Sequence, residues 1–394
     1  MQTMTGDELQ SKTIDFLRFP LAVMVMFIHI PVVFDMASVD YFLPTCIELC
    51  NMTKISISHV VAQAAVPCFF MFSGFLFFYK LPDGNAFSIY LSKLKRRIRT
   101  LLVPYFLWTL IAVLFMALMA GLGGKENVMQ FFSDLGDNGK RGGITGLLWG
   151  SSGHFIINIT GQVMPVYSPY MVSLWFVRDL MIMVLLSPLV YLFLKHTRFY
   201  GILLLGILYY LKIGFVLGRF SSGMFMTAVF FFCLGAYFSI EKKNMILSLR
   251  KRKYLWLLLA VTGGLASAYF DGRGCKIHSI SGEMAIIDMQ NYFLPVYTIS
   301  GVITIINIGS YLIERQKATL RPLLSESSFF VYVAHPLLLP VIGKLLGRIT
   351  PSDNCGMTLA VYFLSPLLCA SLLFCAYCLL KRFVPALSGL LTGR

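Results

Sequence analysis

An arginine and a histidine in the first long apolar segment have the residue types and spacing to do chemistry. Arg18 and His29 are 11 residues apart, and at about 100° per residue this spacing places both side chains on one helix face. They are about 16 Å apart along the axis, roughly half the thickness of a hydrocarbon core. Asp15 precedes Arg18 by three residues, and we expect the two to pair. The pattern predicts a polar stripe that leads from a charged helix end to a buried imidazole.

Two interpretations of His29 are open from the residues alone. A histidine in an apolar segment can simply hydrogen-bond a neighbouring helix. It can also act as a general base that takes a proton from a reacting group. His335 lies near the middle of a later apolar segment, next to a proline. We expect the two histidines to belong to one polar interior.

A dense basic cluster, Lys93-Leu-Lys-Arg-Arg-Ile-Arg99, precedes the third apolar segment. Arg96 and Arg99 are three residues apart and therefore share a helix face. Two guanidinium groups placed in this way form a good phosphate clamp. The alternative is that the cluster serves only to fix the orientation of the next segment in a membrane.

Arg178 and Asp179 are adjacent charges inside the fourth apolar segment. A charge at the centre of a membrane helix costs at least about 2.5–3.5 kcal/mol, so each needs a partner or a function. Because neighbours in sequence are about 100° apart around a helix, we expect each to pair with a different helix. The pair is either a structural one or part of the wall of a substrate cavity.

The composition indicates where these residues must be held. Hydrophobic residues make up 57% of the 394 residues and charged residues only 13%, against about 25% charged in soluble domains. Such an excess of apolar side chains needs a lipid bilayer to cover it. The net charge of +15 lies in short clusters between apolar runs, which is typical of topology signals and excludes a nucleic-acid-binding face.

Ten segments are long and apolar enough to cross a membrane, so the sequence predicts an all-α, polytopic membrane protein with one domain over residues 1–394. These segments are 14–34, 59–79, 101–122, 169–194, 199–217, 224–240, 254–270, 290–313, 326–346 and 358–380. With a cytoplasmic N-terminus, 21 lysines and arginines lie inside and 10 outside. This bias predicts that both termini are cytoplasmic and that the longest loop, roughly 123–168, is outside.

The chain contains a series of short motifs in this order: Arg18-x10-His29, Phe69-Phe-Met-Phe-Ser-Gly-Phe75, Arg96-x-x-Arg99 with Pro104-Tyr105, Leu174-Trp-Phe-x-Arg-Asp179, Phe232-Cys-Leu-Gly235 and Ser328-Phe-x-Val-Tyr-x-Ala-His335. Together they resemble the acyltransferase 3 family of bacterial membrane acyltransferases. The resemblance runs along nearly the whole chain.

This resemblance implies an enzyme of the inner (cytoplasmic) membrane that moves an acyl group, with acetyl as the default, from cytoplasmic acyl-CoA to a hydroxyl of a surface glycan or lipid-linked sugar. His29 would be the catalytic residue, as a base or as a carrier of the acyl group, and Arg18, Arg96 and Arg99 would bind the CoA phosphates. It implies acyl-CoA as a co-substrate, no permanently bound cofactor and no metal. Candidates for the substrate cavity are Asp15, Ser73, Trp175, Arg178, Asp179 and His335. The rival hypothesis is a secondary transporter or flippase of a polar or anionic solute, which would also carry charges in its membrane helices.

Overall fold

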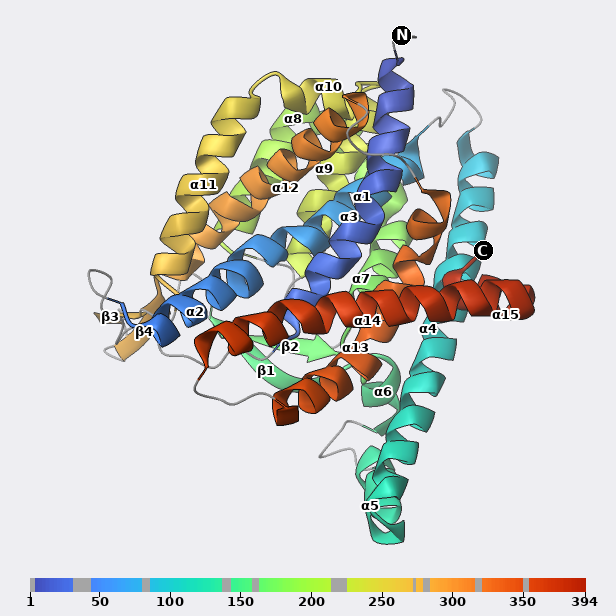
Figure 1. Ribbon diagram of the computed structural model, residues 1–394. Coiled ribbons are helices and arrows are strands. Elements are labelled where there is room, and N and C mark those ends of the chain that lie inside the picture. The colour runs from blue at the N-terminus through green and yellow to red at the C-terminus, as the bar shows by residue number, and fades with distance from the viewer. Residues whose placement is uncertain are drawn as a thin grey trace.

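The computed structural model describes residues 4–30, 44–79, 86–136, 143–157, 163–213, 225–271, 274–278, 284–315, 321–349 and 354–394. Helices dominate these residues (Figure 1). They are α1 (Gly6–Ile28), α2 (Cys46–Ile55), α3 (Ala65–Phe78), α4 (Ala86–Leu122), α5 (Lys125–Gly136), α6 (Gly143–Leu148), α7 (Leu174–Leu185), α8 (Ser187–Tyr210), α9 (Phe225–Ile240), α10 (Met245–Arg250), α11 (Lys253–Tyr269), α12 (Gln290–Glu314), α13 (Pro322–Ile349), α14 (Cys355–Phe383) and α15 (Pro385–Thr392). A π-helical turn, Ser56–Val60, and a 3-10 turn, Val61–Ala64, join α2 to α3.

Six helical stretches within these residues are long and apolar enough to cross a membrane. They are Cys46–Phe78, Tyr90–Leu122, Ser187–Tyr210, Gln290–Glu314, Pro322–Arg348 and Cys355–Phe383. The prediction of a helical, multi-pass membrane protein is therefore confirmed. Residues 31–34 and 214–217 and residue 224, at the ends of predicted segments, lie outside the described residues.

Short elements between the long helices were not predicted. Two antiparallel hairpins pair β1 (Ser151–Ile157) with β2 (Val163–Ser168), and β3 (Gly274–His278) with β4 (Met284–Asp288). The predicted segment 169–194 is divided at Leu186, where α7 gives way to α8. Helix α8 itself is broken at Arg198, which has a φ of 50°, and this break falls between the fourth and fifth predicted segments.

Two glycines let α3 and α9 pack with their backbones almost in contact. A Cβ atom on Gly74 would overlap the carbonyl oxygen of Phe232, and one on Gly235 would overlap the carbonyl oxygen of Met71. The Ser239 hydroxyl adds a hydrogen bond of 2.7 Å to the Phe75 carbonyl. Close approach at small residues is the usual way that membrane helices gain packing energy. The glycines of two sequence motifs are thus explained by helix packing.

We expect Gly74→Ala or Gly235→Ala to lower the Tm of the purified protein, because the added methyl group forces the two backbones apart. Overpacking of this kind costs about 1–3 kcal/mol. Gly343→Ala is the matched control, since nothing lies within 4 Å of a Cβ atom built there. A thermal-shift measurement in detergent that gives all three variants the same Tm would contradict this account of the α3–α9 contact.

Helix α1 crosses the middle of the bundle, where it packs against α3, α12 and α13 (Figure 1). Near its start, the Gln10 side chain accepts a hydrogen bond of 2.7 Å from the Met245 backbone N–H at the start of α10. Near its end, the Ser58 hydroxyl donates to the Phe27 carbonyl at 2.6 Å. The carbonyls of the last turn of a helix lack partners within the helix, so this bond stabilises the end of α1. His29, the C-cap residue, therefore stands at a braced position.

The last two helices cover α2 and α4. A disulfide between Cys50 and Cys355 joins α2 to the start of α14. Helix α15 packs on α4, where the indole N–H of Trp108 donates to the Leu391 carbonyl at 3.0 Å. Gly393, which follows α15, has a φ of 70° and lies so close to α4 that a Cβ atom would overlap the carbonyl oxygen of Thr100. Glycine is the residue that best fits such a position.

Candidate active site

The two histidines of the sequence analysis meet inside the bundle. The ring centroid of His29, at the end of α1, is 5.0 Å from that of His335 on α13. His335 is fully buried, and its Nδ1 lies 2.6 Å from the Tyr332 carbonyl oxygen. Because a carbonyl oxygen only accepts, Nδ1 carries the proton in this contact and Nε2 of the neutral ring is left as an acceptor. The expectation of one interior that holds both histidines is met.

A cavity of about 280 Å³ lies beside Arg18. Arg18 forms the predicted ion pair with Asp15, at 2.8 Å. The lining comes from α1, α3, α4, α7, α13 and the end of α15, and we call this space the inner cavity. It is lined by Arg18, Phe69, Ser73, Arg97, Thr100, Leu101, Phe176, Leu180, Ser325, Glu326, Ser328, Phe329, Tyr332, Thr392, Gly393 and Arg394.

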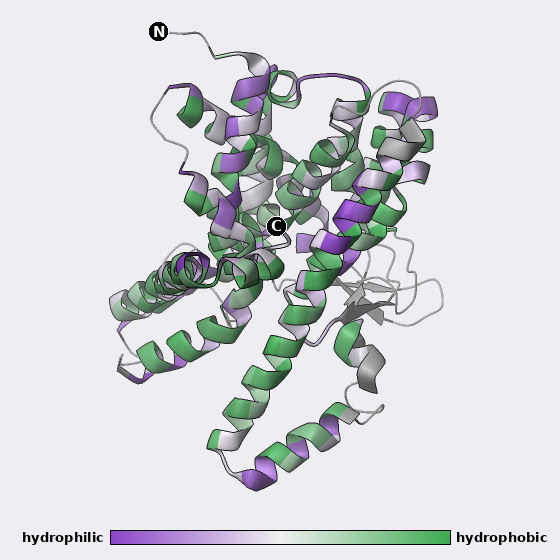
Figure 2. Cartoon of the chain, turned by 90° about the vertical axis from the view of Figure 1, so that its right-hand side faces the viewer, coloured by the Kyte–Doolittle hydropathy of each residue, from purple (hydrophilic) through white to green (hydrophobic). Residues whose placement is uncertain are grey.

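Arg96 and Arg99 lie on a different cavity, of about 550 Å³, which we call the outer cavity. Lys95 also lines it, and both arginines are exposed. The two cavities share Thr100, Gly393 and Arg394 as lining residues. Arg18, Arg96 and Arg99, which were expected to form one group, therefore lie on two adjoining cavities. Figure 2 shows this hydrophilic part of α4 followed by a hydrophobic second half.

The arginine that does share the inner cavity with Arg18 is Arg97, which the sequence analysis missed. Buried Leu101, Tyr105 and Trp108 follow it by four, eight and eleven residues. These intervals return to one side of a helix, so Arg97 extends the buried stripe of α4. This periodicity could have identified Arg97 from the sequence, because it places Arg97, and not Arg96 or Arg99, on the buried face of the helix.

Glu326 of α13, which was not predicted as a site residue, forms ion pairs in the wall of the inner cavity. The Glu326 carboxylate pairs with Lys381 of α14 and, at 3.3 Å, with Arg394. Glu326 and Arg394 both line the inner cavity. The three charges therefore tie α13, α14 and the residues after α15 together at this wall, and Arg394 stays close to the arginines of α1 and α4.

Three aromatic rings in the wall of the inner cavity contact one another, and one of them reaches the histidine pair. Phe69, Phe176 and Tyr332 all line the cavity and contact one another at centroid distances of 5.9, 5.9 and 5.5 Å. The Tyr332 ring is also 6.1 Å from the ring of His335. His29 and His335 line neither cavity. We call these rings the aromatic cluster, because they connect the arginine-lined space to the histidine pair.

The remaining residues that were predicted to line the substrate cavity do not lie together. Ser73 lines the inner cavity, whereas Trp175 packs against Phe70 at 6.2 Å and lines neither cavity. Arg178 and Asp179 are fully buried and pair with each other at 3.1 Å. This contact between neighbours was not predicted, and it forms because the guanidinium arm of Arg178 curves back to Asp179.

The Arg178 guanidinium also donates to the Trp149 carbonyl, outside the long helices. Removing one partner of a buried pair leaves a buried charge and costs about 3–5 kcal/mol. Arg178 therefore joins α7 to the segment that follows α6.

The fold and these features define a multi-pass membrane protein whose helical bundle holds basic cavities and a pair of histidines, one fully buried and one partly buried. Residues 11–380 match the family model Acyl_transf_3, described as an acyltransferase domain. The chain belongs to the acyltransferase 3 family and is a membrane acyltransferase. It is similar to the Succinoglycan biosynthesis protein ExoH of Rhizobium meliloti (strain 1021), with 25% identity over 392 residues that cover 97% of this chain and 92% of the relative. No solved structure matches the chain.

Proposed function

We propose that the protein transfers an acyl group, with acetyl as the default, from cytoplasmic acyl-CoA to a hydroxyl of a surface glycan or lipid-linked sugar. Its family supports acyl transfer, and the name of its relative, a succinoglycan biosynthesis protein, supports a glycan acceptor. The observation that carries the proposal is the histidine pair, which contacts the Tyr332 ring in the wall of an arginine-lined cavity.

The donor site in this proposal uses both cavities. Coenzyme A has phosphates at two places, a pyrophosphate and a phosphate on its ribose. Arg96 and Arg99 on the outer cavity would hold one of these, and Arg18 and Arg97 on the inner cavity the other. Arginine suits this task because its planar guanidinium binds phosphate oxygens through two parallel hydrogen bonds. In this proposal one extended anionic molecule occupies both cavities, which adjoin at Thr100, Gly393 and Arg394.

The thioester end of the donor then passes the aromatic cluster to reach His29. As a general base, His29 takes the proton of the acceptor hydroxyl while the oxygen attacks the thioester carbonyl carbon. The carbon–sulfur bond breaks, and the leaving thiolate takes the proton from His29. In the alternative route, a nitrogen of His29 attacks the thioester carbonyl carbon, the carbon–sulfur bond breaks, and His29 briefly carries the acyl group. The acceptor hydroxyl then attacks this group, the carbon–nitrogen bond breaks, and the hydroxyl proton is left to neutralise the thiolate. Both routes end in an ester and a free thiol.

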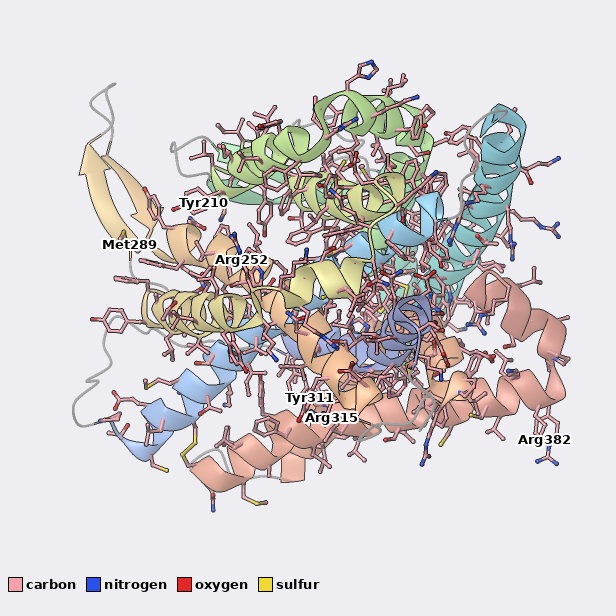
Figure 3. The ribbon with its side chains drawn as sticks, turned by 90° about the horizontal axis from the view of Figure 1, so that it is seen from above. Tyr210, Arg252, Met289, Tyr311, Arg315 and Arg382 are labelled. Atoms are coloured by element: carbon pink, nitrogen blue, oxygen red, sulfur yellow. A yellow bond between two sulfur atoms is a disulfide. The ribbon has the colours of Figure 1, made fainter. Side chains whose placement is uncertain are left out.

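The membrane orientation is part of the proposal, with ten crossing segments, both termini cytoplasmic and the protein in the inner membrane. Arg252, before α11, and Arg315, after α12, lie at the end of the bundle that holds the start of α1 (Figures 1 and 3). Arg315 lies over the Tyr311 ring at 5.8 Å. The β3–β4 hairpin lies at the opposite end of α11 (Figure 1). Clustered arginines favour the cytoplasmic side, which supports this orientation.

We expect the purified protein in lipid nanodiscs to release free CoA thiol from acetyl-CoA, and a glycan acceptor to increase this release. Acetyl groups labelled in the donor should appear on the glycan as esters that mild base removes. If no thiol is released above the rate of empty nanodiscs, while proteoliposomes take up an anionic solute, the transporter hypothesis replaces this one.

A further inference from the structure

One nitrogen of the histidine pair has no partner. Nε2 of His335 is buried and makes no hydrogen bond, although the other nitrogen of the same ring is satisfied at 2.6 Å. A buried polar atom without a partner costs about 1–3 kcal/mol, and such atoms are rare enough to need an explanation. The ring lies next to His29, at the site proposed for catalysis.

The backbone around His335 is braced, so its ring cannot easily turn to satisfy Nε2 elsewhere. The Tyr332 hydroxyl donates to the Ser173 carbonyl at 2.9 Å, and the Ser173 hydroxyl donates to the Val333 carbonyl at 3.1 Å. These two bonds connect α13 to the residue before α7. The Tyr332 carbonyl therefore stays in place, and it keeps the proton of His335 on Nδ1.

The distance to His29 suits a hydrogen bond between the rings. A nitrogen–nitrogen hydrogen bond needs a separation of about 3 Å. The ring centroids are 5.0 Å apart and the ring planes 41° apart, so a nitrogen of each ring would lie near that separation if the two faced one another. The His29 side chain is the one with room to turn, because it is only partly buried whereas that of His335 is fully buried.

We propose that His335 is the positioning residue of the site: its Nε2 accepts the N–H of one His29 nitrogen and so fixes the lone pair of the other nitrogen towards the reacting groups. The inference rests on the proposed function of His29. When His29 takes the proton of the acceptor hydroxyl, its ring becomes cationic, and the N–H directed at His335 becomes a stronger, charge-assisted donor. Enzymes that activate a nucleophile commonly use a further side chain to orient the catalytic base, and His335 would have this role for His29.

The test compares three substitutions of His335 in nanodisc-reconstituted protein. His335→Gln places an amide oxygen near the former position of Nε2, whereas His335→Asn retains a donor near Nδ1 but does not reach His29. We expect His335→Ala and His335→Asn to lower kcat by about 10²-fold or more with little change in the KM for acetyl-CoA. We expect His335→Gln to recover about tenfold of this loss, since it restores the acceptor.

Ser327→Ala is the control for a merely structural effect. It removes a buried hydrogen bond of the same helix, from the Ser327 hydroxyl to the Leu324 carbonyl at 2.9 Å, at a residue that lines neither cavity, so kcat should stay near the wild-type value. Full kcat in His335→Asn, or no advantage of His335→Gln over His335→Asn, overturns the inference. Full activity in His29→Ala would instead overturn the proposed catalytic residue, so the two failures are distinguishable.

A measurement on the wild-type protein keeps the inference testable if the variants do not fold. In solid-state NMR of protein with ¹⁵N-labelled histidine, we expect the His335 ring to carry its proton on Nδ1 and to show a contact to a second imidazole. This is the less common tautomer, so its signal is diagnostic. A proton on Nε2 of His335 would overturn the inference.

Discussion

Replacing His29 with alanine is expected to reduce acyl transfer by at least about 10²–10⁴-fold, the usual contribution of a general base. The protein should still insert and fold, because His29 caps α1 through its backbone and the end of this helix is held by the bond from Ser58 to Phe27. The measurement is labelled acetyl transfer to a glycan by purified variants at equal amounts. His196→Ala is the matched control, since His196 is an exposed histidine on α8.

The same variant also separates the two chemical routes. If His29 carries the acyl group, rapid quenching of the wild-type protein with labelled acetyl-CoA and no acyl acceptor should leave label on the protein, and His29→Ala should leave none. If His29 is only a base, neither protein becomes labelled, but the variant still loses transfer. Wild-type rates of transfer in His29→Ala would remove the residue from the mechanism altogether.

The parts of the site that follow from local periodicity could be predicted from the sequence. The spacing of Arg18 and His29, and the three-residue offset of Asp15, depend only on the geometry of one helix, and the Asp15–Arg18 pair is confirmed. The residues 254–270 and 290–313 were likewise predicted as helices and fall within a residue of α11 and α12. A long uniform helix needs no knowledge of its neighbours, because the apolar run and the 3.6-residue period define it.

The parts that depend on how helices meet could not be predicted in the same way. The position of Arg394 at both cavities results from the docking of α15 on α4, and this docking depends on a close approach of Gly393 to Thr100 that no periodicity reveals. The contact between Arg178 and Asp179 was also not predicted. A helical wheel gives each side chain one fixed direction and does not allow for the bending of a long guanidinium arm. Arg97 is an intermediate case. The sequence shows that it shares one helix face with the buried residues of α4, but the other basic residues around it made this position hard to distinguish.

The division of the basic residues between two cavities predicts different results for two adjacent arginines. We expect Arg97→Ala to raise the KM for acetyl-CoA by about 10–100-fold, because a charge-assisted hydrogen bond contributes about 1.5–3 kcal/mol where water is partly excluded. Arg96→Ala should raise it less, since Arg96 is exposed and solvent and salt screen its charge. The two residues have the same charge and neighbouring positions on one helix, so each is the matched control of the other.

Ionic strength makes this comparison sharper. Raising the salt concentration should reduce the difference between the wild-type protein and a double Arg96→Ala, Arg99→Ala variant, but should leave much of the effect of Arg97→Ala. Arg382→Ala controls for loss of positive charge as such, because Arg382 is exposed on α14 and lines neither cavity (Figure 3). The KM for the glycan should change by less than about twofold in every case. If Arg97→Ala leaves the KM for acetyl-CoA unchanged, the inner cavity does not hold the donor, and the arginines of α4 only orient the helix in the membrane.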